Sequence, residues 1–175
     1  MRVGIMIHPT TAATPAESLD QLIDHVKLAE SEGYTSAWIC ETHFDSDQPE
    51  VAPLVLGGAL AAETEGIRLG VMVKLPLEHP VKTAEDASVI DLMSNGRLLF
   101  GADPGASGIE FSGYSVTEAE GWERFVEALD IVVRAWTSDG FAYLGKFHTL
   151  PKLTRASSVG GSPYVPEPYV APYVD

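Results

Sequence analysis

The sequence contains one cysteine, Cys40, few basic residues and no long apolar run. A single cysteine excludes an intramolecular disulfide and favours a reducing, cytoplasmic setting. Only 11 lysine and arginine residues stand against 25 aspartate and glutamate residues, and the resulting net charge of −14 disfavours binding to nucleic acid or anionic lipid. No window approaches the roughly 20 apolar residues of a membrane span. We therefore expect neither a nucleic-acid nor a membrane partner.

The composition is that of an ordinary globular domain, with 45% hydrophobic and 21% charged residues. We assign residues 1–150 to one folded domain. Residues 151–175 differ, because the triplet Pro-Tyr-Val occurs three times in this stretch and its prolines exclude a helix. This Pro/Tyr-rich segment is predicted to be an extended, poorly packed tail. The alternative is an ordered arm that lies across a partner.

Short apolar runs alternate with segments of helical periodicity. The predicted strands cover residues 3–7, 36–40, 67–73 and 98–100, and the predicted helices cover residues 15–32, 51–64, 79–93 and 117–136. Two capping boxes start helices, one from Thr14 to Glu17 and one from Thr117 to Glu120. The last helix carries an aromatic and aliphatic stripe, including Trp122, that is predicted to lie in the core. Residues 101–113 are predicted to form a loop, and residues 141–147 a hairpin or excursion.

Four repeats of strand and helix predict parallel strands joined by right-handed crossovers. The expected fold is α/β, of TIM-barrel type but incomplete. A full (β/α)8 barrel needs about 250 residues, so this chain supplies about four of the eight β/α units. It can leave its strand edges open, pair with another chain or form a small open sheet. Because bare strand edges promote association, we expect oligomerisation to complete the barrel.

The chemistry of such folds lies beyond the carboxyl ends of the strands. This rule selects His8, Glu41, His43, Lys74 and Asp103. A histidine and a carboxylate that converge on one edge can exchange protons with a bound substrate near neutral pH. The alternative is that Glu41 and His43 only satisfy backbone groups of the loops. Nitrogen and oxygen ligands for a metal are present, but their spacing is not diagnostic, and we predict no metal site.

Several motifs occur in the order found in one enzyme family. They are LAESEGY (28–34), WICETHF (38–44), IRLG (67–70), LPLEHP (75–80), AED (84–86) and DLMSNGRL (91–98), followed by EF (110–111), EAL (127–129) and WT (136–137). This series resembles the bacterial-luciferase family of flavin-dependent monooxygenases. The resemblance covers about residues 1–150, which corresponds to the N-terminal half of the barrel.

The resemblance implies a (β/α)8 barrel that binds reduced FMN, or the deazaflavin F420, at the carboxyl edge. Members of the FMN type activate O2 and insert one oxygen atom into a small organic substrate. By this resemblance His43 is the proton-handling residue and Glu41 orients it. The predicted cofactor contacts are His8, Met72, Val73 and Asp103.

Three features depart from the family pattern. Thr42 stands where the family has the first histidine of Glu-His-His-Phe, and Pro104 stands where relatives often place an arginine against the flavin. Strands five to eight, which supply most of the phosphate-binding loop in relatives, have no counterpart. Two main hypotheses follow: a flavin-dependent monooxygenase that is active once assembled, and a non-catalytic, truncated flavoprotein-like subunit. An F420-dependent oxidoreductase is a further alternative, and a metal-dependent hydrolase a distant one.

Overall fold

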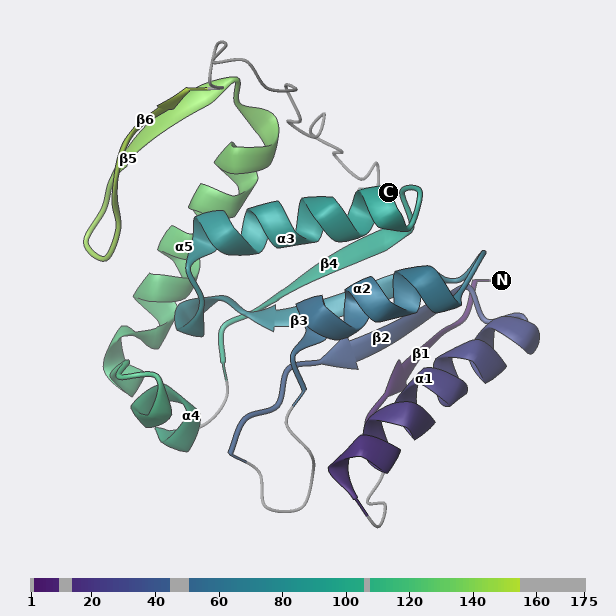
Figure 1. Cartoon of the computed structure of the whole chain (residues 1–175). Helices are drawn as coiled ribbons and strands as arrows, with labels where there is room; N and C mark the ends of the chain where they lie inside the picture. The colour runs from purple at the N-terminus through teal and green to yellow at the C-terminus, as the bar shows by residue number, and fades with distance from the viewer. Residues whose placement is uncertain (1, 10–13, 45–50, 106–107, 155–175) are drawn as a thin grey trace.

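A four-stranded parallel sheet forms the centre of the molecule, in the strand order β1-β2-β3-β4 (Figure 1). The computed structural model describes residues 2–9, 14–44, 51–105 and 108–154, the last four of them by backbone alone. The strands are β1 (Gly4–Ile7), β2 (Ser36–Cys40), β3 (Arg68–Lys74) and β4 (Leu98–Asp103). All three pairings are parallel, as predicted, so the four carboxyl ends lie along one edge of the sheet.

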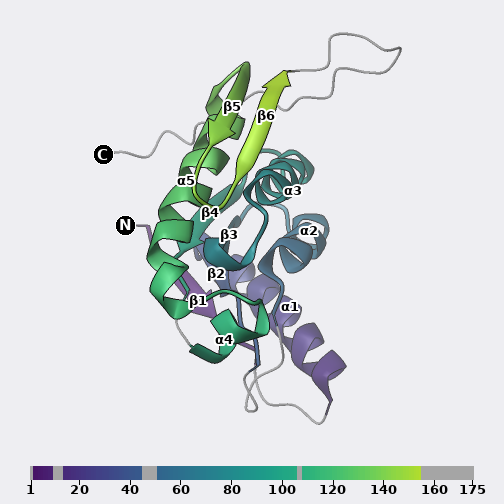
Figure 2. The same cartoon turned by 90° about the vertical axis from the view of Figure 1, so that its left-hand side faces the viewer.

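Helices α1 (Pro15–Ser31), α2 (Pro53–Glu63) and α3 (Pro80–Met93) cover one face of this sheet (Figures 1 and 2). Alternate strand residues point toward these helices and form the hydrophobic core. They are Ile7, Ala37, Ile39, Leu69, Val71, Val73 and Leu98, all buried. A Cβ atom at Gly57 of α2 would press on Val71 and Ile90, so this glycine lets α2 approach β3 and α3 closely.

The opposite face of the sheet, which we call the inner face, carries no described helix. The Trp38 ring lies across this face above Gly70, where any larger residue on β3 would collide with it. Met72 covers Gly101 of β4 in the same way. Toward the amino ends of the strands the face opens into a hollow of about 830 Å³, bordered by Trp38, Arg68 and Leu99. In the described part of the chain, β1 and β4 each pair with one neighbour, so both sheet edges are bare.

The chain from the end of β4 to α5 differs from the prediction in four respects. Strand β4 continues to Asp103, and residues 101–113, predicted to be a loop, contain the short helix α4 (Gly108–Gly113). The second capping box is wrong, because Thr117 makes no side-chain cap and precedes a 3-10 turn, η2 (Glu118–Glu120). The long helix α5 (Gly121–Thr137) then packs against α3. Trp122 is 65% exposed, which corrects its assignment to the core.

The predicted hairpin is present. Strands β5 (Gly140–Leu144) and β6 (Thr149–Thr154) pair antiparallel beside α5 (Figure 2). Its turn is held by Glu127 of α5, whose carboxylate accepts hydrogen bonds from the backbone N–H groups of Lys146, Phe147 and His148. Strand β6 crosses the domain boundary predicted at residue 150, and residues 155–175 of the predicted tail lie outside the described residues. No helix among the described residues has the length and apolarity to cross a membrane.

Candidate active site

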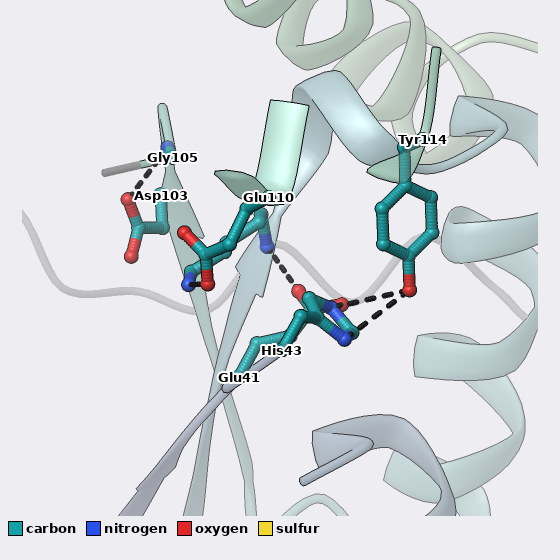
Figure 3. Close-up of polar contacts among 7 residues, drawn as sticks. Glu41, His43, Asp103, Gly105, Glu110 and Tyr114 are labelled. Carbon is teal, nitrogen blue, oxygen red and sulfur yellow. Dashed lines mark hydrogen bonds and ion pairs between the residues drawn. The ribbon is translucent and has the colours of Figure 1, made fainter. Parts of the chain in front are cut away.

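Glu41 and His43 lie side by side at the carboxyl end of β2 (Figure 3). The Glu41 Oε1 atom is 2.8 Å from Nε2 of His43. Glu41 is a buried carboxylate, only 6% exposed. A buried carboxylate against one ring nitrogen fixes the tautomer of a neutral imidazole, so His43 carries its proton on Nε2 and offers Nδ1 as an acceptor. The two residues that the sequence placed on one edge thus form a direct pair.

Strand β3 holds Glu41 in place. The backbone N–H of Lys74 donates a 2.5 Å hydrogen bond to Oε2 of Glu41, and the backbone N–H of Glu41 donates to the carbonyl oxygen of Met72 at 3.2 Å. The Lys74 ammonium group forms a buried ion pair with Glu110 of α4. Lys74 therefore connects the end of β2 with α4.

Tyr114, directly after α4, faces His43 from the other side. Its hydroxyl oxygen lies 3.2 Å from Nδ1 and 3.4 Å from Nε2 of His43, and the two ring centroids are 4.9 Å apart. Phe44 completes this aromatic group at 6.1 Å from the Tyr114 ring. The Phe44 ring packs so closely on Gly113 that a side chain there would collide with it. A backbone φ of 55° at Phe44 is part of this arrangement.

Glu78 adds a second carboxyl group to the same edge. It follows the 3-10 turn η1 (Leu75–Leu77) after β3. Burial raises the pKa of Glu78, and the negative charge of Glu41 raises it further, while His43 acts in the opposite direction. Its titration is therefore coupled electrostatically to the Glu41–His43 pair.

The structure separates the other four predicted site residues. Met72 lies on the inner face, whereas the Val73 side chain points into the helix-covered core and is buried. Asp103 ends β4 beside Lys74 and accepts a hydrogen bond from the backbone N–H of Gly105 at 2.8 Å. His8 lines a different hollow, of about 420 Å³, between β1 and α1. These four positions stay predictions for cofactor contact.

The carboxyl edge suits part of a flavin. Phe44 and Tyr114 present partly exposed aromatic rings at this edge, which suit contact with a flat aromatic ring system. A phosphate finds less support. Of the side chains described at the ends of the four strands, only Lys74 carries an ammonium or guanidinium group, and Glu110 already pairs with it. The described residues thus fit the ring of FMN and leave its phosphate to other groups.

The described residues contain no group of three or more histidine, cysteine, aspartate or glutamate side chains arranged to hold a metal ion. The Glu41–His43 pair has an oxygen and a nitrogen but lacks a third such ligand there. Its geometry is that of a hydrogen-bonded acid–base pair.

A family model described as luciferase-like monooxygenase matches residues 1–172. The chain belongs to the luciferase-like monooxygenase family. The oxygenase component of flavin-dependent trigonelline monooxygenase from Acinetobacter baylyi is 29% identical over 163 residues, 89% of this chain and 45% of that protein. The monooxygenase RslO1 from Streptomyces bottropensis has a TM-score of 0.83 and 25% identity, and the match covers 93% of this chain and 51% of that one.

A further structural neighbour was solved with FMN bound. It is the oxygenating constituent of 3,6-diketocamphane monooxygenase from Pseudomonas putida in complex with FMN, with a TM-score of 0.79 and 24% identity. The match covers 89% of this chain and 45% of that chain, so the likeness concerns the fold. The chain spans about half the length of the relatives it matches. The parallel α/β sheet is consistent with the TIM-barrel type of fold.

Two residues of this site were not predicted, Tyr114 and Glu78. Tyr114 is 71 positions away from His43 in the chain, and the loop assigned to residues 101–113 gave no indication that α4 would turn it toward β2. Glu78 lies within the LPLEHP motif at the end of β3. The rule that chemistry follows strand ends would have reached it if applied to the residues after Lys74.

Proposed function

We propose that this chain forms the flavin-binding and proton-handling half of an FMNH2-dependent monooxygenase that acts on a small organic substrate with O2. The observation that carries the proposal is the partly buried Glu41–His43 pair beside the aromatic rings of Phe44 and Tyr114, at the carboxyl edge of a parallel sheet. Reduced FMN, when bound, supplies the electrons that activate O2. The chain's own residues bind the ring, exclude water and hold a proton at His43.

Each of the site residues predicted from the sequence has a role in this function. Glu41 accepts the Nε2–H of His43 and keeps Nδ1 directed away from the sheet, where it can take up or release a proton. Met72 and the two aromatic rings provide apolar contact for the isoalloxazine and limit access of water to it. Asp103 and His8 are candidates for polar contacts to the cofactor, and Val73 contributes through its backbone.

The proposed activity requires the other half of a barrel. The bare edges of β1 and β4, the hollow on the inner face and the half-length match to relatives all favour completion by further β/α units. A second copy of this chain, or the second half of a barrel, would supply these units. They would also supply the cationic and backbone groups for the flavin phosphate, which the described edge lacks.

Flavin binding is the direct test. The chain contains three tryptophans, so a variant with Trp122→Phe and Trp136→Phe keeps Trp38 of the inner face as the sole reporter. Titration with oxidised FMN, with reduced FMN under anaerobic conditions and with F420 should quench Trp38 fluorescence and shift flavin absorbance for FMN. Preference for F420 would redirect the proposal to an F420-dependent oxidoreductase. Absence of binding by all three would overturn it for this chain.

A non-catalytic flavoprotein-like subunit is the second candidate, and specific residues favour it. Thr42, at the position of the family's first histidine, makes a backbone bridge with Val51 and brings a hydroxyl that cannot act as a base near neutral pH. Flavin binding together with unchanged turnover in His43→Ala would support this reading. A marked loss of turnover in His43→Ala would support the monooxygenase.

A further inference from the structure

We propose that Tyr114 is the terminal proton relay of the site, carrying a proton between Nδ1 of His43 and a substrate oxygen. The proposal deepens the monooxygenase function and rests on it for the identity of the substrate. It assigns three linked groups, the Glu41 carboxylate, the His43 imidazole and the Tyr114 hydroxyl, to one path.

The contact distances define the order of this path. Glu41 occupies the Nε2 side of His43 at 2.8 Å, which leaves Nδ1 as the nitrogen that can exchange a proton. The Tyr114 hydroxyl oxygen lies 3.2 Å from this Nδ1 atom and 3.4 Å from Nε2, and Nδ1 is its partner because Glu41 already pairs with Nε2. A phenol oxygen has one hydrogen and two lone pairs, so it donates to Nδ1 when the ring is neutral. When the ring is an imidazolium, the phenol oxygen can accept from Nδ1–H and donate its own hydrogen outward.

Exposure decreases along the same path. Tyr114 is 38% exposed, the His43 side chain 12% and the Glu41 side chain 3%. A molecule that approaches the edge therefore meets Tyr114 before His43. We therefore expect the Tyr114 hydroxyl to contact the substrate and the His43 imidazole to exchange protons with this hydroxyl.

The surrounding structure holds both ends of the path. Lys74 donates its backbone N–H to Glu41 and pairs its ammonium group with Glu110, and the carbonyl oxygen of Glu110 accepts the backbone N–H of Tyr114 at 3.2 Å. Tyr114 and His43 therefore keep their positions through one shared residue. Such pre-organisation reduces the reorganisation that a proton transfer requires.

The proton transfer balances in both directions. When the site acts as an acid, the Tyr114 O–H bond breaks, its proton joins the substrate oxygen, and the proton of Nδ1–H on imidazolium restores the phenol. His43 ends neutral, with its remaining proton on Nε2 toward Glu41. When the site acts as a base, the substrate proton moves to the Tyr114 oxygen, and the phenol proton moves to Nδ1.

The first test needs no flavin. Nitrogen-15 NMR of the His43 ring in the full chain should show a neutral imidazole with its proton on Nε2, and the Nδ1 resonance should move in Tyr114→Phe. Tyr34→Phe is the matched control, because Tyr34 is a partly exposed tyrosine that follows α1. An unmoved Nδ1 resonance in Tyr114→Phe, or a neutral ring protonated on Nδ1, would overturn the relay.

The second test uses turnover of the flavin-loaded assembly. Tyr114→Phe and His43→Gln should each lower the rate by about 100-fold, within the range of general acid–base contributions. The double variant should be no slower than the slower single variant, because both residues act in one path. Multiplying effects, or a normal rate in Tyr114→Phe, would overturn the relay. If no flavin binds, the proposed function fails, while the NMR result still decides the Tyr114–His43 connection.

Discussion

The backbone N–H of Lys74 donates a 2.5 Å hydrogen bond to Oε2 of Glu41 on the neighbouring strand. The ammonium group of the same residue forms an ion pair with Glu110 of α4. One lysine at the end of β3 thus fixes the carboxylate that orients His43 and the helix that precedes Tyr114. The arrangement explains how an acid-rich edge can keep a defined geometry, since Lys74 gives its backbone N–H to one buried carboxylate and its ammonium group to the other.

Removing this cation should destabilise the protein strongly. Lys74→Met removes the ammonium group that pairs with the buried Glu110 carboxylate, and breaking a buried ion pair in this way typically costs about 3–5 kcal/mol of unfolding free energy. Urea unfolding at neutral pH measures the loss. The backbone hydrogen bond to Glu41 does not depend on the side chain and should persist.

The double variant Lys74→Met/Glu110→Gln is the matched control for this ion pair. It removes both charges, so it should recover a large part of the stability lost in Lys74→Met. If the double variant were less stable than Lys74→Met, the loss would come from packing of the lysine stem and not from an isolated charge.

The two Thr-x-x-Glu motifs should respond differently to truncation. Thr14→Ala removes a formed capping box, in which the Thr14 hydroxyl accepts from Glu17 N and the Glu17 carboxylate accepts from Thr14 N, both at 3.2 Å. It should cost about 1 kcal/mol. Thr117→Ala should change stability by less than about 0.5 kcal/mol, because its side chain makes no cap. Equal losses in the two variants, measured by thermal unfolding, would contradict the structure.

The contrast between these motifs explains how far the sequence predicts this fold. Hydrophobic periodicity and the residues that start or stop elements were enough to predict the parallel strands, α1 and the hairpin, because each of these elements depends on residues close together in the chain. At Thr117 the following residues turn as a 3-10 helix, and α5 begins only at Gly121. A capping motif reflects only a local preference for a helix start. Here the tertiary structure between α4 and α5 outweighs that preference.

The candidate site likewise contains residues that the sequence predicts and residues that depend on tertiary contacts. Glu41 and His43 follow one strand, so the rule for strand ends predicts their convergence. Tyr114 reaches His43 only because Lys74 binds Glu110 and Phe44 packs against Gly113, contacts between segments far apart in the chain. No periodicity encodes such contacts. The burial of Val73 on the core side was in principle predictable from its alternation with Met72 along β3.

Glu127 should stabilise the hairpin in a pH-dependent way. Burial alone would raise its pKa, but hydrogen bonds from His148, Lys146 and Phe147 outweigh burial and hold the pKa below the usual value of 4.5. The stabilisation is therefore present above the unfolded-state pKa and is lost as pH falls through the folded-state pKa. Glu127→Ala should cost about 1–3 kcal/mol at pH 7, because buried N–H groups lose their acceptor.

Glu123 provides the control for this prediction. Its carboxylate pairs with Lys146 of the same turn at 2.6 Å, but both side chains are more than half exposed. Glu123→Ala should therefore cost less than about 1 kcal/mol. Urea unfolding from neutral to acidic pH should show the gap between wild type and Glu127→Ala narrowing as the wild-type carboxylate becomes protonated. A gap that stays constant with pH would assign the effect to packing instead of charge.

Glu78 should behave in the opposite sense. Burial first, and the charge of Glu41 second, raise its pKa above the usual value of 4.5. A raised carboxyl pKa means that the folded protein favours the protonated form, so Glu78 contributes best below its unfolded-state pKa, and this contribution is lost as pH rises through the folded-state pKa. Glu78→Gln, which keeps the size and removes the charge, should therefore make the protein more stable at pH 7.

The gain in stability of Glu78→Gln over wild type should disappear as the wild-type carboxyl becomes protonated in acid. A Glu78→Gln variant that is less stable than wild type at pH 7 in urea unfolding would contradict a raised pKa of the Glu78 carboxyl group.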